Sequence, residues 1–380
     1  MTSVFFAFRD APERRAALQA QESLDRYRLF GLDDIAGKGA TVRHNLERAA
    51  TPAWARVASR GVNAGLHAFG IPGGDFSAVL PCLRELNSAD VVFSTVDTVG
   101  IPLLVLKRAR ILRPPLVYAS IGLPERLERV RNEQAFRRAL RTARSIVAYS
   151  AIEADRLRAW IGGEAPPVAF VPFGVDVNAF RPVDVEPDVD VVSVGADPRR
   201  DFELLLAIAS RRPELSFRIV ATTERRRALG SPPPNVTVES DVPLEVVRDR
   251  LARARVVALP VRENSYSGAT TTLLQGMAVA KPVVVSRTDA IASGYNLRDG
   301  VNCRLVSPGD AAAFAAALDE LLASSATADA IGTRARETVV ENFTWQRYTD
   351  TLWEILCASV ERRNADAGAE SARVREREFG

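Results

Sequence analysis

Short, uninterrupted runs of apolar residues alternate along this chain with longer segments of helical periodicity. Continuous apolar runs, as opposed to alternating ones, are typical of parallel strands that are buried on both faces. We expect two series of strands, at Val4–Phe8, Thr41–Leu46, Asp90–Ser94, Leu116–Ser120, Ser145–Tyr149 and Val168–Val171, and then at Asp190–Val194, Phe217–Val220, Val236–Val238, Val256–Val261 and Val283–Ser286. The pattern predicts an α/β protein made of two successive Rossmann-like domains.

The segment between the two series of strands differs from them in composition. Phe180–Asp190 combines prolines with acidic residues and has little helix propensity, so we interpret it as an interdomain linker. The expected domains are residues 1–180 and 181–340, and an amphipathic helix pair is expected within Glu337–Val360. Residues 363–380 are expected to form a charged, frayed tail. Helical periodicity elsewhere predicts helices at Ala11–Phe30, Asp201–Arg211, Leu244–Arg253, Gly268–Val279 and Ala311–Leu322.

Composition narrows the class of protein without identifying it. The 380 residues are 47% hydrophobic and 26% charged, which is ordinary for a soluble globular chain. No apolar run approaches the roughly 18 residues of a membrane-spanning helix, and the apolar start is too short for a secretory signal. The formal net charge is +3, and no basic stripe is interleaved with aromatic residues, so nucleic acid is not an expected partner.

The supply of metal-binding and nucleophilic side chains is small. His44 and His67 are the only histidines, and Cys82, Cys303 and Cys357 lie far apart. A disulfide framework, a zinc knuckle and a multi-histidine metal site are therefore not expected. Neither histidine lies near the glycine pattern of a nucleophile elbow, which argues against a Ser-His-Asp hydrolase. No metal and no bound cofactor are expected.

The segment Val256–Ser286 has the order strand, polar loop, helix, strand. Ser267 and Gly268 place small residues where a backbone could approach a ligand closely, and three threonines follow in the first helical turn. Thr271 and Gln275 are four residues apart and share one helix face. The pattern fits either a phosphate site at a helix N-terminus or a plain helix start with hydroxyl caps.

A second candidate for anion binding follows the first strand of the second series. The strand ends at Gly195, and Arg199 and Arg200 stand just before the next helix. Guanidinium groups at the carboxyl end of a strand could bind a diphosphate through paired hydrogen bonds. The alternative is two solvated arginines on a loop.

Four segments, in order, resemble one family. They are Ser145–Trp160 with the following VAFVPFGVDVNAFRP, the strand and turn in Ser193–Leu206, LLQGMAVAKPVVVS, and DGVNCRLVSPGD. Together they resemble the retaining glycosyltransferases of family four, also called glycosyltransferase group 1, which have the GT-B fold of two Rossmann-like domains facing across a cleft. The resemblance covers most of the chain after about Asp90.

The resemblance implies a nucleotide-sugar donor on the second domain and an acceptor on the first. The implied donor site consists of Gly195, Arg199, Arg200, Asp241, Val242, Glu263, Ser267, Gly268, Ala269, Thr271 and Gln275. In this assignment the arginines contact the diphosphate, the backbone around Gly268 meets the distal phosphate or sugar, Gln275 holds the ribose hydroxyls, and Asp241 and Val242 line the base. A last helix, residues 341–362, is implied to pack back on the first domain.

The chain departs from the family pattern at several positions. Two glutamates that the family commonly has eight residues apart are replaced by Ser267 and Gln275, and Glu263 could supply an acid from the preceding loop. The position of a family histidine corresponds to Ser120, which we assign with Arg200 as a catalytic candidate. The first strand is followed by RDAPERR in place of a glycine-rich loop.

The function implied is transfer of a hexose-like sugar from a nucleotide diphosphate to an acceptor, with retention and without a metal. The acceptor class is left open between a small molecule, a glycan and a lipid-linked molecule. Two alternatives stay open: a non-catalytic nucleotide-sugar-binding partner protein, and a GT-B nucleotide-sugar epimerase. The expected location is cytoplasmic, and a peripheral position at the inner membrane face is the second option.

Overall fold

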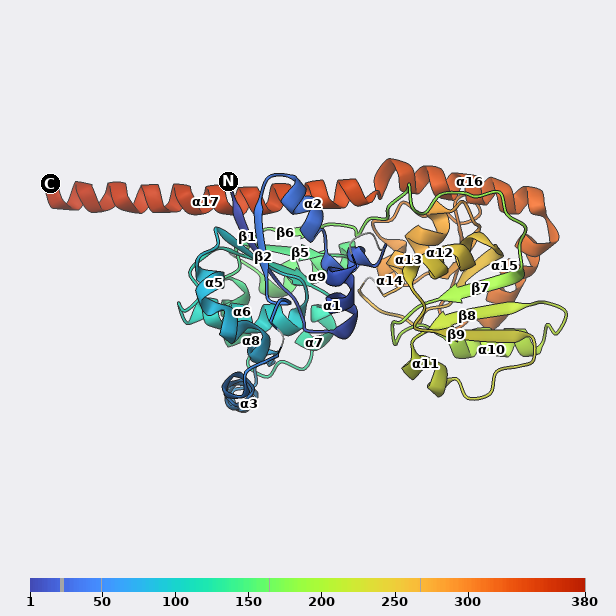
Figure 1. Cartoon of the computed structure of the whole chain (residues 1–380), viewed down its shortest axis with the longest axis horizontal. Coiled ribbons are helices and arrows are strands. Elements are labelled where there is room, and N and C mark those ends of the chain that lie inside the picture. Colours follow the sequence, from blue (N-terminus) through green and yellow to red (C-terminus); the bar gives the residue numbers. More distant parts are fainter. Residues whose placement is uncertain (21–23, 49, 164, 267, 380) are drawn as a thin grey trace.

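Two parallel six-stranded sheets, each flanked by helices, form the two halves of the molecule (Figure 1). The computed structural model describes residues 1–20, 24–48, 50–163, 165–266 and 268–379, with side chains described up to residue 365. Each strand predicted from the apolar runs has an observed counterpart, so the predicted α/β class with two Rossmann-like domains is confirmed.

The first sheet has the strand order β2-β1-β3-β4-β5-β6, with all neighbours parallel. Its strands are β1 Ser3–Ala7, β2 Thr41–His44, β3 Val91–Ser94, β4 Leu116–Ser120, β5 Ser145–Ala148 and β6 Val168–Phe170. Its helices are α1 Pro12–Gln19, η1 Leu24–Leu29, α2 Leu32–Gly37, α3 Ala53–Ala68, α4 Phe76–Val79, η2 Leu80–Cys82, α5 Leu83–Asn87, α6 Asp97–Arg108, α7 Leu123–Leu127, α8 Glu133–Leu140 and α9 Ala151–Ile161.

The second sheet has the order β12-β11-β10-β7-β8-β9, again all parallel. Its strands are β7 Val189–Val194, β8 Phe217–Ala221, β9 Val236–Ser240, β10 Ala254–Leu259, β11 Val283–Ser286 and β12 Arg304–Val306. Its helices are α10 Phe202–Ser210, α11 Thr223–Ala228, α12 Leu244–Ala252, α13 Thr270–Ala278, α14 Asp289–Ala292, α15 Ala311–Ala323 and α16 Ser325–Asn342. The strand β12 was not predicted, because it is only three residues long and includes an arginine.

The continuous apolar runs are explained by cores on both faces of each sheet. In β3, Val92 packs in one core of the first domain, whereas Val91 and Phe93 pack in the core on the opposite face. All three side chains are fully buried. Successive residues of a strand point to opposite faces, so a strand covered on both sides needs apolar residues at every position.

The last helix, α17 Trp345–Phe379, leaves the second domain and runs along the first (Figure 1). Tyr348, Leu352 and Leu356 are buried in the core that includes β1 and β3, and Nε1 of Trp345 donates to Oδ2 of Asp34 at 2.9 Å. The expectation of a frayed tail after residue 362 is wrong, because the helix continues to Phe379. The tail is rich in alanine, glutamate and arginine, which are strong helix formers.

Candidate functional site

A cleft of about 680 Å³ lies at the carboxyl ends of β7, β8 and β9, between the two domains. The first strand of the second domain, β7, lies at the centre of its sheet. The strands β8 and β9 lie on one side of it and β10, β11 and β12 on the other, so the direction in which strands are added reverses beside β7. Ligands of open α/β sheets collect at such a point, outside the carboxyl ends of the strands. The α1–η1 segment of the first domain forms the opposite wall.

Most of the donor-site residues expected from the sequence line this one cleft. They are Gly195, Asp241, Val242, Gly268, Ala269, Thr271 and Gln275. They come from three separate loops and one helix, and the fold brings them together. Ser267, which was assigned to the same site, lies outside the described residues.

The start of α13 gives the cleft an anion-binding character. Ala269 is its N-cap residue and offers no side-chain hydrogen bond to the first turn, and Gly268, Ala269 and Thr271 all line the cleft. Backbone N–H groups at the start of a nine-residue helix, together with the helix dipole, favour a phosphate or carboxylate there. Of the two interpretations offered by the sequence, this geometry favours the phosphate site.

The backbone of Gly268 lies close to two side chains of the same domain. A methyl group at Gly268 would lie 3.2 Å from Cγ of Asp197 and 3.1 Å from the ring of Tyr266. Oδ1 of Asp197 accepts hydrogen bonds from the Tyr266 hydroxyl at 2.8 Å and from N of Arg199 at 2.7 Å. Burial raises the pKa of Asp197 above its ordinary value. Neither Asp197 nor Tyr266 was predicted from the sequence to belong to the site.

The loop after β9 is held in a strained conformation. Asp241 has a φ of +53°, which is uncommon for a residue other than glycine, and its Oδ2 accepts hydrogen bonds from N and Oγ1 of Thr223. Non-glycine residues in this region persist only when surrounding contacts hold them. The contact with Thr223 therefore joins the loops after β8 and β9 where both reach the cleft.

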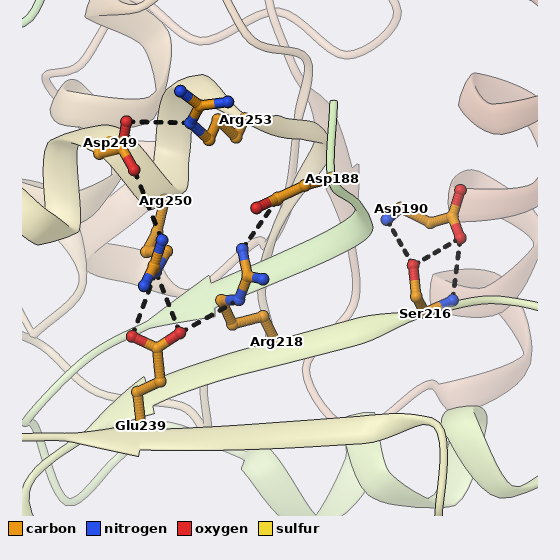
Figure 2. A network of polar contacts seen from close by, with 8 residues as sticks. All are labelled: Asp188, Asp190, Ser216, Arg218, Glu239, Asp249, Arg250 and Arg253. Carbon is orange, nitrogen blue, oxygen red and sulfur yellow. Dashed lines mark hydrogen bonds and ion pairs between the residues drawn. The ribbon is translucent and has the colours of Figure 1, made fainter. Parts of the chain in front are cut away.

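A polar network fixes the elements on either side of this loop (Figure 2). Both carboxylate oxygens of Glu239 on β9 accept hydrogen bonds from Nε of Arg250 on α12, at 3.0 and 3.1 Å. Glu239 also pairs with Nε of Arg218 on β8 at 3.2 Å, and Arg218 donates to Asp188 at 2.8 Å. The network joins β8, β9 and α12, so the loop that carries Asp241 is held in position by the elements on both sides of it.

The first domain supplies a wall that sequence reasoning did not identify. Glu13, Tyr27 and Arg28 line the cleft opposite α13. The Arg28 guanidinium lies 5.3 Å from the centre of the Tyr27 ring and pairs with Asp25 at 2.8 Å. Periodicity predicted only a helix over Ala11–Phe30, and no local signal marks these side chains as ligand-facing.

A smaller cavity of about 210 Å³ adjoins the cleft on the first-domain side. Phe30, Ile121, Tyr149 and Phe173 line it together with Arg14, whose pKa is lowered to about 10 by burial. It shares Glu13, Tyr27, Arg28 and Thr271 with the larger cleft, so the two spaces are continuous.

Arg200, which was expected to contact the diphosphate, lies in the interior of the second domain. Arg200 is fully buried and does not line the cleft. Its Nη2 donates to Oγ of Ser193 at 2.9 Å, its guanidinium lies 5.5 Å from the Phe202 ring, and burial lowers its pKa to about 9. The backbone explains this placement, because Arg200 forms an antiparallel bridge with Val261 that turns the residue inward.

Arg199 and Glu263 also lie away from the cleft. Arg199 is exposed and pairs with Glu125 of the first domain at 3.4 Å. Glu263 is exposed as well, and its Oε1 accepts hydrogen bonds from the backbone N–H groups of Asn264 and Asp289. Both side chains therefore stabilise loops and do not line the donor cleft.

Ser120, which was assigned as a catalytic candidate, does not line the cleft either. It is fully buried and donates to Oε1 of Glu153 at 2.7 Å, and the same oxygen accepts from N of Gly122 at 2.7 Å. Burial raises the pKa of Glu153 to about 8. Ser120 and Glu153 act on the cleft by fixing the turn whose middle residue, Ile121, lines the smaller cavity.

Within the described residues, no three histidine, cysteine, aspartate or glutamate side chains gather closely enough to hold a metal ion. In the same part of the chain, none of the helices has the length and apolar character needed to cross a membrane.

Comparison with known proteins shows that the second domain is similar to one family. Residues 184–324 match the family model described as glycosyl transferases group 1. The chain is 25% identical over 323 residues to the D-inositol 3-phosphate glycosyltransferase of Kineococcus radiotolerans, covering 74% of this chain and 72% of that protein. It is 25% identical over 162 residues, or 42% of its length, to the lipopolysaccharide core biosynthesis glycosyltransferase LpsE of Rhizobium meliloti, and the match spans about half of that relative, 47%.

Solved structures show the same architecture along the whole chain. The sucrose-phosphate synthase of Thermosynechococcus elongatus matches with a TM-score of 0.68 over 97% of this chain and 100% of that chain, at 16% identity. The Anabaena protein HepE, solved in complex with UDP-glucose, matches with a TM-score of 0.68 over 94% and 100%, at 15% identity. The chain therefore has the GT-B fold throughout, and its second domain is similar to the glycosyl transferases of group 1.

Proposed function

We propose that this protein transfers a sugar from a nucleotide diphosphate donor to an acceptor, with retention at the anomeric carbon and without a metal ion. The observation that carries the proposal is the convergence of Gly268, Ala269 and Thr271 at the start of α13, with Gln275 further along the same helix, in one interdomain cleft. A helix N-terminus of this kind suits a diphosphate, whose negative charge grows as it leaves the sugar.

The rest of the cleft fits the other parts of such a donor. Thr271 and Gln275, one turn apart on α13, are suited to the ribose hydroxyls, and Asp241 and Val242 are suited to the base. UDP-sugars are the first donors to test, because UDP-glucose is the ligand of the structurally similar HepE. The proposal assigns the acceptor to the smaller aromatic cavity on the first-domain side.

Metal independence is proposed because cationic groups are available for the leaving diphosphate. Arg28 lines the cleft, the start of α13 contributes its N–H groups, and the buried charge of Arg200 lies behind the wall formed by Gly195. Preorganised donors of this kind can stabilise a leaving group without a metal. Retention is proposed from the likeness to family four.

A second candidate is a nucleotide-sugar-binding protein without transferase activity. It is favoured by the placement of the two residues that were assigned to catalysis, because the side chains of Ser120 and Arg200 are both fully buried. Gln275 in place of a glutamate also removes a charge-assisted bond to the donor, worth about 1–2 kcal/mol.

One set of measurements tests both candidates. Thermal unfolding with UDP, GDP, TDP, ADP and their sugars identifies the donor, because a ligand that binds only the native state raises the melting temperature. Release of nucleotide from that donor, followed with and without EDTA, then tests turnover and the metal. Binding without turnover would support the second candidate, and loss of turnover in EDTA with rescue by one divalent ion would contradict metal independence. The anomeric configuration of the product, read by NMR, tests retention.

A further inference from the structure

The helix α3 exposes an unusual number of large apolar side chains. Trp54, Val57 and Val62 on the helix and Phe69 at its C-cap have exposed fractions of 57, 65, 38 and 72%. Figure 1 shows α3 at an outer edge of the first domain, away from both the second domain and α17. Single exposed apolar residues are common on protein surfaces, but a cluster on one element marks an interaction site.

The inward face of α3 includes polar residues, whereas its outward face carries large apolar side chains. Ala55 and Ser59 are buried against the domain, and Asn63 faces the same way, donating to O of Gly74 at 2.8 Å and accepting from N of Gly74 at 3.0 Å. At 100° per residue, Trp54 and Val57 project from the opposite side, whereas Val62 lies on the flank of the helix next to Ala55. A helix that only covers a core keeps its polar residues outward, so the exposed apolar side chains of α3 indicate a second apolar partner.

The charges on α3 point to the nature of that partner. Arg56 and Arg60 are one turn apart and exposed, and on a helical projection they lie along one edge of the apolar face. The helix has no aspartate or glutamate, and no ion pair of either arginine is found within the described residues. Tryptophan and phenylalanine on one face with arginines at its edge are the composition of a helix that lies in a membrane interface.

We propose that the outer face of α3 docks on an anionic lipid bilayer surface. Trp54, Val57 and Phe69 would enter the boundary between headgroups and acyl chains, and Arg56 and Arg60 would contact lipid phosphates. A second copy of this chain fits less well, because pairing two α3 helices would bring four arginines together with no acidic residue on either helix. The proposal does not depend on the proposed transferase activity, since the surface lies apart from the residues of the cleft.

Vesicle binding of the full-length protein tests this proposal directly. We expect co-sedimentation with vesicles of equal parts phosphatidylglycerol and phosphatidylcholine, and much weaker binding to phosphatidylcholine alone. Replacing Trp54 and Phe69 together by serine should weaken binding at least tenfold. The double variant Arg56→Gln/Arg60→Gln should weaken it about fivefold per arginine, in line with the usual contribution of one basic residue near an anionic surface.

Matched controls separate α3 from the rest of the surface. Ile111→Ser/Val301→Ser removes two apolar side chains of similar exposure, 47 and 45%, and should leave vesicle binding unchanged. Arg108→Gln/Arg110→Gln removes the same charge outside α3, and only a minor loss is expected. All these residues are exposed, so the melting temperature of each variant should match the wild type.

Fluorescence identifies the face that makes contact. On binding, the emission of Trp54, taken as the difference between wild type and Trp54→Phe, should shift to shorter wavelength. Absence of binding to anionic vesicles, or equal binding by the Trp54→Ser/Phe69→Ser variant, would overturn the proposal. So would a dimer in sedimentation velocity that this variant abolishes without any vesicle binding, because the partner would then be a second copy of the chain.

Discussion

The side chain of Arg200 lies directly against Gly195. A methyl group at Gly195 would come within 2.9 Å of Cγ and 3.0 Å of Nε of Arg200, and Gly195 itself lines the interdomain cleft. Nε and Nη1 of Arg200 are buried and have no hydrogen-bond partner within the described residues. A buried cation with unused donors destabilises a fold, and an anion bound in the cleft would offset part of that cost.

Replacing Arg200 by methionine should therefore separate stability from function. Methionine keeps much of the buried volume and removes the charge, so we expect a melting temperature equal to or above that of the wild type. The apparent kcat/KM should fall by a factor that corresponds to a loss of about 1.5–3 kcal/mol of transition-state stabilisation. This is the contribution of a hydrogen bond or field from one charged group. Thermal unfolding and initial rates with the identified donor check both expectations.

The contact with Gly195 provides an internal control. Gly195→Ala should lower the melting temperature in the wild-type background, because its methyl group collides with Arg200. In the Arg200→Met background the flexible side chain can move, so the two changes should be non-additive. A strongly destabilised Arg200→Met variant with normal kcat/KM would show instead that this arginine is purely structural.

The Glu153 carboxyl should make stability depend on pH. Burial raises its pKa to about 8 in the native state, against an ordinary value of 4.5. Between these values the native state holds a proton that the unfolded state releases, so stability is full below pH 4.5 and is lost as pH rises through 8. Glu153→Gln keeps the acceptor for Ser120 and Gly122 and removes the titration, so its unfolding free energy should vary less with pH.

Urea unfolding at pH 6.5 and 8.5 measures this effect. Burial also raises the pKa of Asp97, to about 6, so most of its titration lies below this range. We expect the wild type to lose on the order of 1–3 kcal/mol of unfolding free energy between the two pH values, and Glu153→Gln to lose clearly less. Equal losses in the two proteins would mean that Glu153 is ionised in the native state.

The fold was predictable because its main signal is local. Each buried strand needs apolar residues on both faces, as in Val91 and Val92. This requirement produces a run of consecutive apolar residues that can be recognised in the sequence. The helix start at Gly268–Thr271 was predictable for the same reason, because small residues and threonines stand next to each other. Such features need no knowledge of the distant parts of the chain.

The rest of the site depends on contacts between distant segments. Arg200 turns inward through a bridge to Val261, which no local pattern indicates. Ser150 and Glu153 have the spacing of a helix capping box, yet Ser150 makes no cap and Glu153 reaches Ser120, 33 residues away. Arg28 lines the cleft only because the two domains face each other.

Truncation should divide α17 into a required and a dispensable part. Tyr348, Leu352 and Leu356 are at most 2% exposed and complete the core of the first domain. Ending the chain after Asn342 removes them and should give insoluble protein, since burying each such side chain contributes about 1.5–3 kcal/mol. Figure 1 shows the end of α17 extending past the first domain, so deleting residues 366–380 should leave the melting temperature within about 2 °C of the wild type.

Expression trials and thermal unfolding of the two truncated proteins check this division. Soluble protein of normal melting temperature after truncation at Asn342 would show that α17 does not stabilise the first domain. A large loss of stability on deleting residues 366–380 would show that the end of the helix makes contacts of its own.

Arg28 and Arg199 offer a direct test of which arginine serves the donor. Arg28 lines the cleft, with its side chain 35% exposed and paired with Asp25, whereas Arg199 pairs with Glu125 outside the cleft and is 45% exposed. If the diphosphate lies at the start of α13, Arg28→Gln should lower kcat/KM by a factor that corresponds to about 1.5–3 kcal/mol of transition-state stabilisation, because a charge-assisted contact to the leaving group is lost. Arg199→Gln removes only a surface ion pair and should cost less than about 1 kcal/mol. The two variants each lose one positive charge and should unfold like the wild type. A difference between their rates therefore reflects the position of the arginine and not the change in net charge. The reverse order of effects would move the diphosphate toward Arg199 and the loop after β7.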